Sequence, residues 1–196
     1  MQTCKFVAVG DGAVGKTAIM LSYTSNSTPS DYQPTVFDNY NAITMFDEKP
    51  VSMCCWDTAG QDDYDHLRYL SYPQTDCFIL CFSLISPVSF SNITSKWVPE
   101  LRKHCPDVPI LLVGTKLDLR SDKNHLAEMQ RRGLECITTQ QGMKLAQDVG
   151  ACGYVECSAI TQENLKQVFD SALLAWAQHR EAIRRKQRKQ ECCNIM

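Results

Sequence analysis

A glycine-rich pattern that ends in lysine and threonine is the feature of the chain with the clearest chemistry. It comes directly after the apolar run Phe6–Val9 and reads Gly10-Asp11-Gly12-Ala13-Val14-Gly15-Lys16-Thr17. A strand, such a loop and then a helix would aim backbone N–H groups and the positive helix end at one place. Lys16 can reach the β- and γ-phosphates of a nucleotide, and the Thr17 hydroxyl can bind Mg²⁺. The pattern predicts a nucleoside phosphate site rather than a plain glycine turn.

A second segment, Asp57-Thr58-Ala59-Gly60-Gln61, follows the apolar run Val51–Trp56. An aspartate that ends a strand beside a phosphate loop can hold Mg²⁺ through its water shell. Gly60 lets a backbone N–H approach a γ-phosphate, where a side chain would clash. Gln61 carries a donor and an acceptor, so it can orient a water for in-line attack without acting as a strong base. Beside the phosphate loop, this segment indicates hydrolysis rather than an ordinary turn.

A third segment, Thr115-Lys116-Leu117-Asp118, follows the apolar run Ile110–Gly114. The Asp118 carboxylate can accept hydrogen bonds from the ring N–H and the exocyclic amine of guanine, whereas adenine would leave it unpaired if it were buried. The Lys116 stem can cover one face of the base. Further on, Cys157-Ser158-Ala159 ends another strand and offers backbone N–H groups to the guanine carbonyl. In this order the segments predict guanine, and Asp118 disfavours an ATPase or a kinase.

The stretch Ser25–Asp38 is polar, contains two prolines and lacks a clear period. A long irregular loop in a compact domain is usually functional, although a plain surface connection is the alternative. Tyr32 and Thr35 can contact Mg²⁺ and the γ-phosphate, which would order the loop with the triphosphate and release it after hydrolysis. Apolar residues in and after this loop predict an exposed patch for partners, formed by Val36, Phe37, Tyr64, Leu67 and Leu70.

These segments need a scaffold that brings several strand ends to one edge. The hydrophobic pattern predicts strands over Phe6–Val9, Ala42–Phe46, Val51–Trp56, Phe78–Ser83, Ile110–Gly114 and Tyr154–Glu156. It predicts helices over Lys16–Tyr23, Phe90–His104, Gln141–Val149 and Asn164–Arg185. Asp47–Pro50 reads as a hairpin-like turn between the second and third strands. The predicted fold is α/β: a doubly wound, mostly parallel six-stranded sheet of the P-loop NTPase type, with one antiparallel edge strand and helices on both faces.

Composition agrees with one domain, since 44% of the 196 residues are apolar, which suffices for one substantial core. We expect neither a membrane span nor a signal peptide. The eleven cysteines are scattered without framework spacing, which predicts reduced thiols in the cytosol and no zinc site. Several fall in apolar strands, where cysteine packs as a small hydrophobe: Cys54, Cys55, Cys77, Cys81 and Cys157.

Charge concentrates at the end of the chain. Residues 180–191 hold six basic and two acidic side chains, a net +4, whereas the whole chain carries −2. The last four residues, Cys193 to Met196, form a C-a-a-X box for prenylation of Cys193. Basic residues beside one lipid chain supply the second signal for stable anchoring, and Cys192 is a candidate for palmitoylation. The sequence predicts attachment to the cytoplasmic face of a membrane, with a cytosolic pool, and no nucleic-acid binding.

Together the motifs resemble those of a small GTPase over Lys5–Trp176, and most closely the Rac-like branch of the Rho family. Residues Tyr32–Tyr40 resemble the first switch of that branch, and residues Asp57–Tyr64 resemble its second switch. Three further features are similar to that branch: Trp56 before the second switch, Thr115 where most small GTPases have asparagine, and Asp122–Arg132, similar to a helical insertion. We therefore expect a GTPase domain over 1–178, with the insertion near 121–133, and a polybasic tail over 179–196.

The resemblance implies a GTP/GDP switch with Mg²⁺ and intrinsic hydrolysis. Its catalytic positions fall on Gln61, Lys16, Thr35 and Gly60, and its metal positions on Thr17, Thr35 and, through water, Asp57. Its nucleotide-binding positions fall on Gly12, Ala13, Val14, Gly15, Lys16, Thr17, Ala18, Tyr32, Thr35, Ala59, Gly60, Thr115, Lys116, Asp118, Leu119, Ser158 and Ala159.

The implied partners are exchange factors, GTPase-activating proteins, a dissociation inhibitor and effectors, all through residues 25–40 and 60–72 of a monomer. By resemblance, the pathway is actin or cytoskeletal signalling at membranes. The alternative is a fast-exchanging or hydrolysis-poor module that holds effectors constitutively. The terminal methionine favours a farnesyl group, whereas Rho-like proteins often carry geranylgeranyl, so the lipid stays open.

Two positions depart from the pattern of these relatives. Tyr69 stands where Rac-like chains commonly have proline, which bears on partner choice. Thr28 stands where Rho- and Ras-like chains usually carry a phenylalanine edge-on against the guanine base. Because Thr28 offers neither ring nor comparable apolar area, we expect fast GDP release, unless a neighbour such as Tyr23 or Tyr32 covers the base.

Overall fold

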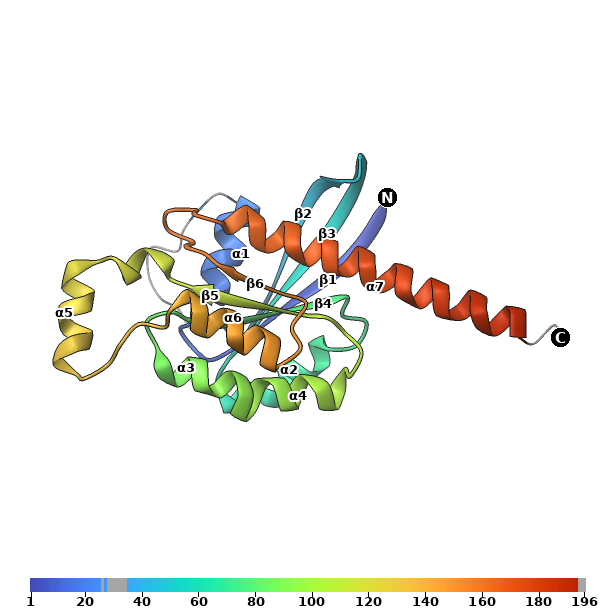
Figure 1. Ribbon diagram of the computed structural model, residues 1–196. Coiled ribbons are helices and arrows are strands. Elements are labelled where there is room, and N and C mark those ends of the chain that lie inside the picture. The colour runs from blue at the N-terminus through green and yellow to red at the C-terminus, as the bar shows by residue number, and fades with distance from the viewer. Residues whose placement is uncertain (26, 28–34, 194–196) are drawn as a thin grey trace.

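The computed structural model describes residues 1–25, 27 and 35–193, with side chains as far as residue 188. Six strands form one sheet in the order β2-β3-β1-β4-β5-β6 (Figure 1). They are β1 Gln2–Val9, β2 Phe37–Phe46, β3 Lys49–Thr58, β4 Cys77–Ser83, β5 Ile110–Thr115 and β6 Gly153–Glu156. Only the edge pair β2 and β3 is antiparallel. This sheet confirms the predicted α/β fold.

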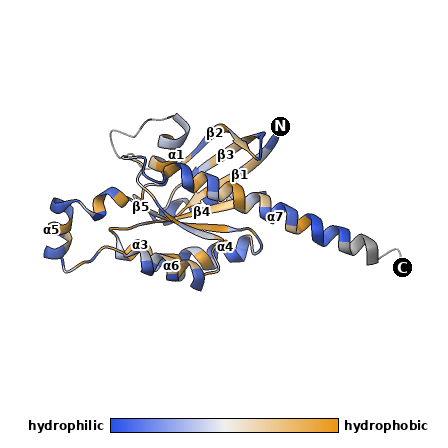
Figure 2. Ribbon diagram, turned by 45° about the horizontal axis from the view of Figure 1, so that its top comes forward, coloured by the Kyte–Doolittle hydropathy of each residue, from blue (hydrophilic) through white to orange (hydrophobic). Residues whose placement is uncertain are grey.

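Helices cover both faces of the sheet because neighbouring side chains of a strand point to opposite sides. In β1, Phe6 and Ala8 pack in one core with α1 and α7, whereas Val7 and Val9 pack in the other, which includes residues of α4 and α6. The longer helices are α1 Lys16–Ser25, α5 Lys123–Arg131, α6 Thr139–Asp148 and α7 Leu165–Cys193. Figure 2 shows hydrophobic residues concentrated in the central strands and hydrophilic ones along α5 and the outer part of α7.

The predicted helix Phe90–His104 differs from the structure at its start and in its middle. It begins as α3, Pro87–Asn92, with Ser86 as its N-cap and Pro87 in its first turn. It continues through a π-helical turn, η2 Ile93–Trp97, into α4 Val98–His104. The cap explains the earlier start, since the Ser86 hydroxyl accepts from the Ser89 N–H.

The hairpin between β2 and β3 is tighter than predicted. Asp47 and Glu48 alone form the turn, with φ values of +49° and +59°, and Lys49 and Pro50 already belong to β3. Two successive left-handed residues suit the twist of a two-residue hairpin. Pairing with β3 also extends β2 back to Phe37, well before the predicted start at Ala42, because ladder hydrogen bonds hold polar residues there.

Two helices were missed or underestimated. α2, Asp65–Ser71, follows a short 3₁₀ turn, η1 Asp62–Tyr64, and is too short to show a clear period. α7 continues to Cys193 rather than ending at Arg185, because the basic residues that follow are good helix formers. The remaining predicted strands and helices differ only at their ends.

The nine cysteines whose side chains are described are free thiols. Cys55, Cys77, Cys81 and Cys157 are buried as predicted, but Cys54 is only half-buried, since its side chain points away from the core that Cys55 enters. In the described part of the chain, no helix is long and apolar enough to cross a membrane.

Candidate functional site

The predicted site residues follow strands β1, β3, β5 and β6, whose carboxyl ends meet at one edge of the sheet. Parallel neighbours place these ends side by side, and ligands of doubly wound sheets bind there. The glycine-rich loop follows β1, Asp57 lies in the last part of β3, and the two base segments follow β5 and β6. Segments more than 100 residues apart in sequence are thus neighbours in the site.

The glycine-rich loop turns tightly against β4. Gly10 has a φ of +142°, and a Cβ there would lie 2.1 Å from the Cys81 carbonyl oxygen, so only glycine fits. Lys16 is 6% exposed and its Nζ donates to the carbonyls of Gly10 (2.9 Å) and Asp11 (2.8 Å). Burial lowers the pKa of Lys16. Within the described residues, no hydrogen bond uses the backbone N–H groups of residues 12–18. The loop therefore offers a row of unpaired donors around a buried cation, which suits an anion.

Three oxygen-bearing side chains meet beside this loop. The Thr17 hydroxyl donates to Asp57 Oδ2 at 2.5 Å and lies 2.6 Å from the Thr35 hydroxyl oxygen. Asp57 is fully buried, and its Oδ1 has no hydrogen-bond partner among the described residues. Burial raises the pKa of Asp57, against the hydrogen bond from Thr17 and the charge of Lys16. Hydroxyl and carboxylate oxygens with an orphaned buried lone pair fit a hard cation such as Mg²⁺.

Gly60 packs against the loop so closely that a Cβ would lie 2.3 Å from the carbonyl carbon of Asp11 and 2.4 Å from Gly12 N. The requirement for glycine thus comes from the protein itself, in addition to the predicted approach to a phosphate. On the other side, a Cβ added to Gly12 would lie 3.9 Å from Gln61 Cγ. The Gln61 side chain therefore stands over the loop where the terminal phosphate of a bound nucleotide is expected.

The base segments differ in part from expectation. Asp118 lies in a 3₁₀ turn, η3 Leu117–Arg120, and is half-buried. Of the three predicted N–H donors after β6, that of Cys157 donates to Gly114 O (2.8 Å) and that of Ser158 to Glu163 O (3.0 Å). Within the described structure only the Ala159 N–H is left for a guanine carbonyl. The competing acceptors come from β5 and a following turn, which sequence spacing does not reveal.

The Thr115 hydroxyl bonds to backbone carbonyls of the protein. Thr115 is 1% exposed, and its hydroxyl lies 3.0 Å from Phe82 O and also contacts Val14 O. The hydroxyl therefore joins β4, β5 and the glycine-rich loop. The other predicted contacts, Ala13, Val14, Gly15 and Ala18, lie in that loop or the first turn of α1, and Leu119 lies in η3 beside Asp118.

An ion pair that sequence reasoning missed holds the two base segments together. Arg120, two residues after Asp118, donates to both carboxylate oxygens of Glu156 at 2.7 Å. Glu156 also accepts from Tyr154 OH (2.7 Å) and Thr139 Oγ1 (3.0 Å). The only feature of the sequence that points to this ion pair is that a basic residue follows the Asp118 segment and an acidic residue precedes the Cys157 segment.

A family model described as Ras family matches residues 5–178. This chain belongs to the Ras family. It is a GTP-binding molecular switch, a small GTPase that hydrolyses GTP, and the family generally binds GTP or GDP with Mg²⁺. Ras family proteins interact with exchange factors, activating proteins and effectors, and they are commonly associated with membranes.

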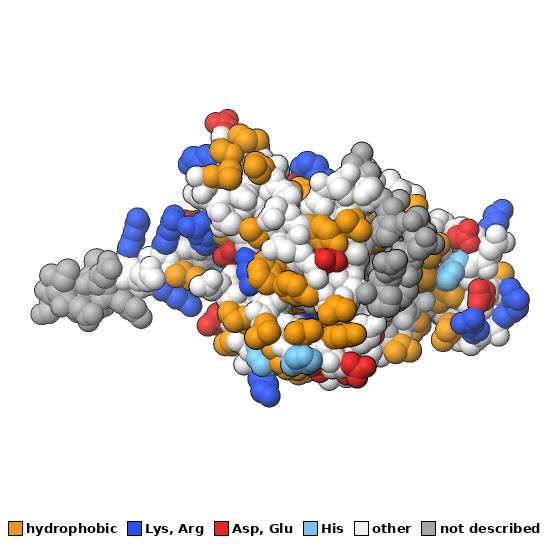
Figure 3. Space-filling model, turned by 180° about the vertical axis from the view of Figure 1, so that it is seen from behind, with side chains coloured by type: hydrophobic (Ala, Val, Ile, Leu, Met, Phe, Trp, Pro, Cys, Tyr) orange, Lys and Arg blue, Asp and Glu red, His pale blue; other side chains and the backbone are white. Residues whose placement is uncertain are grey.

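In this small GTPase the predicted apolar patch is exposed in part. Val36, Phe37 and Leu70 are 43%, 40% and 73% exposed, whereas Tyr64 and Leu67 are half-buried. On the face shown in Figure 3, hydrophobic side chains gather between charged ones.

Trp56 joins this surface from β3. Phe37 packs edge-on against it with 5.1 Å between ring centroids, and Lys5 Nζ lies 3.9 Å from its ring centroid. Trp56, one of the features similar to the Rac-like branch, thus lies beside Phe37 at the start of β2.

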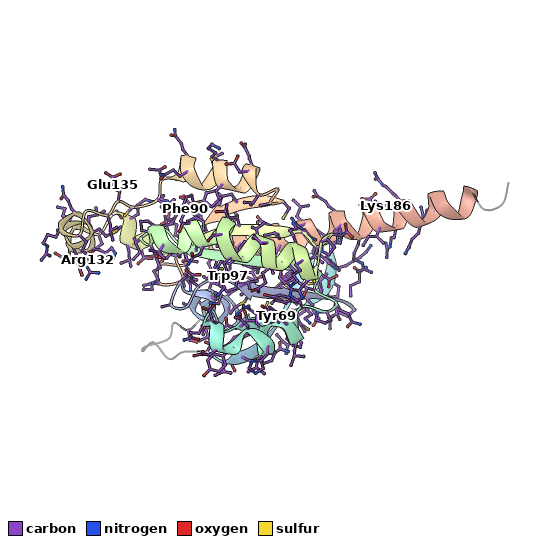
Figure 4. The ribbon with its side chains drawn as sticks, turned by 90° about the horizontal axis from the view of Figure 1, so that it is seen from below. Tyr69, Phe90, Trp97, Arg132, Glu135 and Lys186 are labelled. Carbon is purple, nitrogen blue, oxygen red and sulfur yellow. The ribbon has the colours of Figure 1, made fainter. Side chains whose placement is uncertain are left out.

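Tyr69, the departure from proline, turns toward α4. Its ring stacks on His104 with centroids 4.5 Å apart, and Figure 4 shows it beneath that helix. It therefore adds an aromatic contact within the domain.

Some predictions fall outside what the structure describes. Thr28 and Tyr32 lie outside the described residues, and so do the side chains of Cys192 and Cys193, although α7 includes their backbone. A helix, α5, lies inside the segment predicted as an insertion, with Asp122 as its N-cap.

Proposed function

We propose that this small GTPase is a Rho-family switch of the Rac-like branch, which binds effectors when GTP is bound and releases them when GDP is bound. The observation that carries the proposed switching is the contact between Thr17 and Thr35, whose hydroxyl oxygens lie 2.6 Å apart. Thr35 belongs to the first switch and Thr17 to the glycine-rich loop. A metal held by both would tie the switch to the nucleotide.

Each part of the site has a proposed role in hydrolysis. The N–H groups of residues 12–18 and Lys16 hold the phosphates. Lys16 Nζ would then donate to phosphate oxygens in place of the carbonyls of Gly10 and Asp11. Thr17, Thr35 and, through water, Asp57 hold Mg²⁺, which would neutralise charge on the phosphate oxygens. Gln61 accepts from and donates to the attacking water, and Gly60 and Ala59 place it above the loop.

Guanine recognition is proposed to use one carboxylate and one backbone donor. Asp118 would accept from the ring N–H and the amine of guanine, while Ala159 N–H would donate to the carbonyl. Lys116, which is held in a left-handed conformation with a φ of +60°, would cover one face with its stem.

Switching would expose different surfaces in the two states. Val36 and Phe37 directly follow Thr35, so losing the Thr35 contact after hydrolysis would free them from their GTP-bound position. Effectors, exchange factors, activating proteins and a dissociation inhibitor are proposed to bind there and at residues 60–72. Helix α5 and Trp56 support the Rho-family and Rac-like assignments, and these imply cytoskeletal signalling.

The test compares GTP-loaded with GDP-loaded protein in a pull-down of candidate effectors, alongside single-turnover hydrolysis. Residues 25–40 contain neither Arg nor Lys, so the first switch offers no arginine in cis and the intrinsic rate should be slow, on the order of 10⁻⁴ to 10⁻³ s⁻¹. Gln61→Leu should abolish both this rate and its acceleration by an activating protein. Equal recovery of partners in both nucleotide states would overturn the switch proposal.

A second candidate function, a fast-exchanging module, is favoured by the position of Tyr23. Its ring stacks on Phe169 of α7 with centroids 3.8 Å apart, within the core rather than toward a base. Of the two aromatic neighbours that could replace the usual phenylalanine at Thr28, Tyr23 is thus engaged elsewhere.

The end of the chain is proposed to anchor the protein through a prenyl group on Cys193, with Cys192 as a second lipid site. Helix α7 presents Arg184, Arg185, Lys186 and Arg188 as exposed side chains before the box, and Lys186 is labelled in Figure 4. These cations would lie against the anionic leaflet that a lipidated Cys193 enters.

A further inference from the structure

Trp97 holds the glycine-rich loop through the side chain of Asp11. It is fully buried in the π-helical turn η2, and its Nε1 donates to Asp11 Oδ1 at 2.7 Å. Asn92, at the end of α3, donates from Nδ2 to Asp11 Oδ2, also at 2.7 Å. Both carboxylate oxygens of Asp11 are therefore fixed by one helical segment, labelled at Trp97 in Figure 4.

The ring of Trp97 makes cation–π contacts with Arg68 and Lys96, two residues that bond to the second switch. The Arg68 guanidinium carbon lies 4.8 Å from the Trp97 ring centroid and Lys96 Nζ lies 4.4 Å from it. Arg68 donates to Ala59 O at 3.1 Å, and Lys96 pairs with the Asp62 carboxylate. Ala59 and Asp62 lie on either side of Gly60 and Gln61.

Arg68 is itself held firmly. Its side chain is fully buried and makes two hydrogen bonds to Glu100 of α4, at 3.0 and 2.9 Å, and one to Asp65 at 2.6 Å. A buried guanidinium with several charge-assisted bonds has little freedom to move. Its bond to the Ala59 carbonyl therefore fixes the backbone just before Gly60.

The two halves of the hydrolytic site meet within reach of these contacts. Gly60 packs directly on the peptide between Asp11 and Gly12, and Gln61 stands over Gly12. A shift of Asp11 by a fraction of an ångström would therefore change the distance between the loop and Gln61. Well-oriented catalytic groups lose much of their effect when displaced by such amounts.

We propose that Trp97 is a positioning residue for GTP hydrolysis: its indole N–H fixes the phosphate loop, while its ring supports the cations that fix the Gln61 segment. Trp97 acts through Asp11, Arg68 and Lys96 rather than on the substrate. The proposal rests on the role proposed above for Gln61.

The chain contains a matched control for the test. Trp176 is also buried and also lies under a cation, with the Arg180 guanidinium carbon 5.1 Å from its ring centroid. Its Nε1 has no hydrogen-bond partner among the described residues. Trp97→Phe and Trp176→Phe thus make the same change in a buried ring, but only the first removes a hydrogen bond to the loop.

Both variants, Gln61→Leu and the wild type are loaded with GTP and Mg²⁺. Single-turnover hydrolysis and the dissociation of labelled GDP are then measured on the same preparations. Trp97→Phe should slow hydrolysis about tenfold, because the loop and Gln61 lose part of their alignment and a misplacement of about 1 Å can cost roughly a hundredfold. GDP dissociation should change less than twofold, as should both rates in Trp176→Phe. Hydrolysis within twofold of wild type in Trp97→Phe overturns the proposal, and so does a GDP release that accelerates as much as hydrolysis slows.

A second pair of variants keeps the test decisive if Trp97→Phe fails to fold. Asn92→Asp places a carboxylate against the Asp11 carboxylate and should slow hydrolysis. Adding Asp11→Asn gives position 11 an amide, whose NH₂ can donate to the new carboxylate at position 92 while its oxygen still accepts from Trp97 Nε1. Recovery in the double variant supports fixation of the loop by this helix, and no recovery contradicts it. Undiminished hydrolysis in Gln61→Leu would instead refute the proposed role of Gln61, and with it the support of the Gln61 segment by Trp97, whatever rate Trp97→Phe shows.

Discussion

Arg120 and Glu156 join through two hydrogen bonds of 2.7 Å between η3 and the end of β6. Arg120 follows the Asp118 segment and Glu156 precedes the Ala159 segment, so the pair fixes the distance between the two halves of the proposed base site. Although burial raises the pKa of Glu156, hydrogen bonds from Arg120, Tyr154 and Thr139 outweigh it and hold the pKa below its ordinary value of 4.5.

Removing this charge should lower stability in a pH-dependent way. Glu156→Gln should lower the free energy of unfolding by about 1–3 kcal/mol at neutral pH, because it weakens a charge-assisted pair. Since the folded pKa of Glu156 is depressed, its contribution is present above pH 4.5 and is lost as the pH falls through the folded pKa. Urea unfolding of both proteins at pH 7 and below pH 4.5 checks this. A difference that grows in acid would contradict it.

Base choice should change with one atom at Asp118. Asp118→Asn should weaken GTP binding and shift preference toward xanthine nucleotides, whose ring has a carbonyl where guanine has its amine. Competition of GTP and XTP against labelled GDP measures the shift. Asp107→Asn makes the same change at an exposed position far from the motifs and should leave both affinities unchanged. Unaltered GTP affinity in Asp118→Asn would refute the assignment.

Spontaneous exchange should slow when the missing ring is restored. Thr28→Phe should slow the release of labelled GDP roughly two- to tenfold, the effect of an aromatic contact of about 0.5–1.5 kcal/mol. Thr28→Val keeps a branched side chain without a ring and should release GDP at the wild-type rate. Equal rates in wild type and Thr28→Phe would end the fast-exchange proposal.

The membrane anchor should depend on one cysteine. Cys193→Ser should leave the protein cytosolic in cell fractionation, whereas Cys152→Ser, a change at an exposed cysteine within the domain, should not. Neutralising Arg184, Arg185, Lys186, Arg188 and Lys189 should weaken attachment without stopping prenylation, since each basic side chain near an anionic leaflet contributes about 1 kcal/mol. Membrane retention of Cys193→Ser would be decisive against a prenyl anchor.

Local patterns carried most of what could be predicted. Glycine spacing identified the loop before Lys16, and apolar runs identified the six strands, because backbone turns and strand burial leave marks on adjacent residues. The contacts of Asp11 could not be predicted in this way. Its partners Asn92 and Trp97 lie 81 and 86 residues away, and only the packing of α3 and η2 on the sheet brings them together.

The same limit explains why competing hydrogen bonds at the proposed base site could not be predicted. The sequence predicts that Ser158 N–H is available to a ligand, but in the structure it donates to Glu163 O. That acceptor is a backbone atom, and its position depends on the turn before α7, which the sequence pattern does not specify. Thr115 resembled a base contact by its place in a motif, whereas its hydroxyl is taken by carbonyls from two other segments. A sequence shows which groups can donate hydrogen bonds, but not which of them already donate to acceptors within the folded protein.

Helix α7 leaves the domain without a break. Its first half is buried through Phe169, Leu173 and Trp176, Arg180 still reaches Gln2 at 3.3 Å, and residues 181–188 are exposed. At 1.5 Å per residue, the helix from Arg180 to Cys193 extends about 20 Å beyond that last contact. With a lipid on Cys193, a rigid helix rather than a flexible linker would connect the domain to the membrane. The angle at which the switches meet the bilayer would then be dictated by the helix, and effectors would encounter a surface with a preferred tilt.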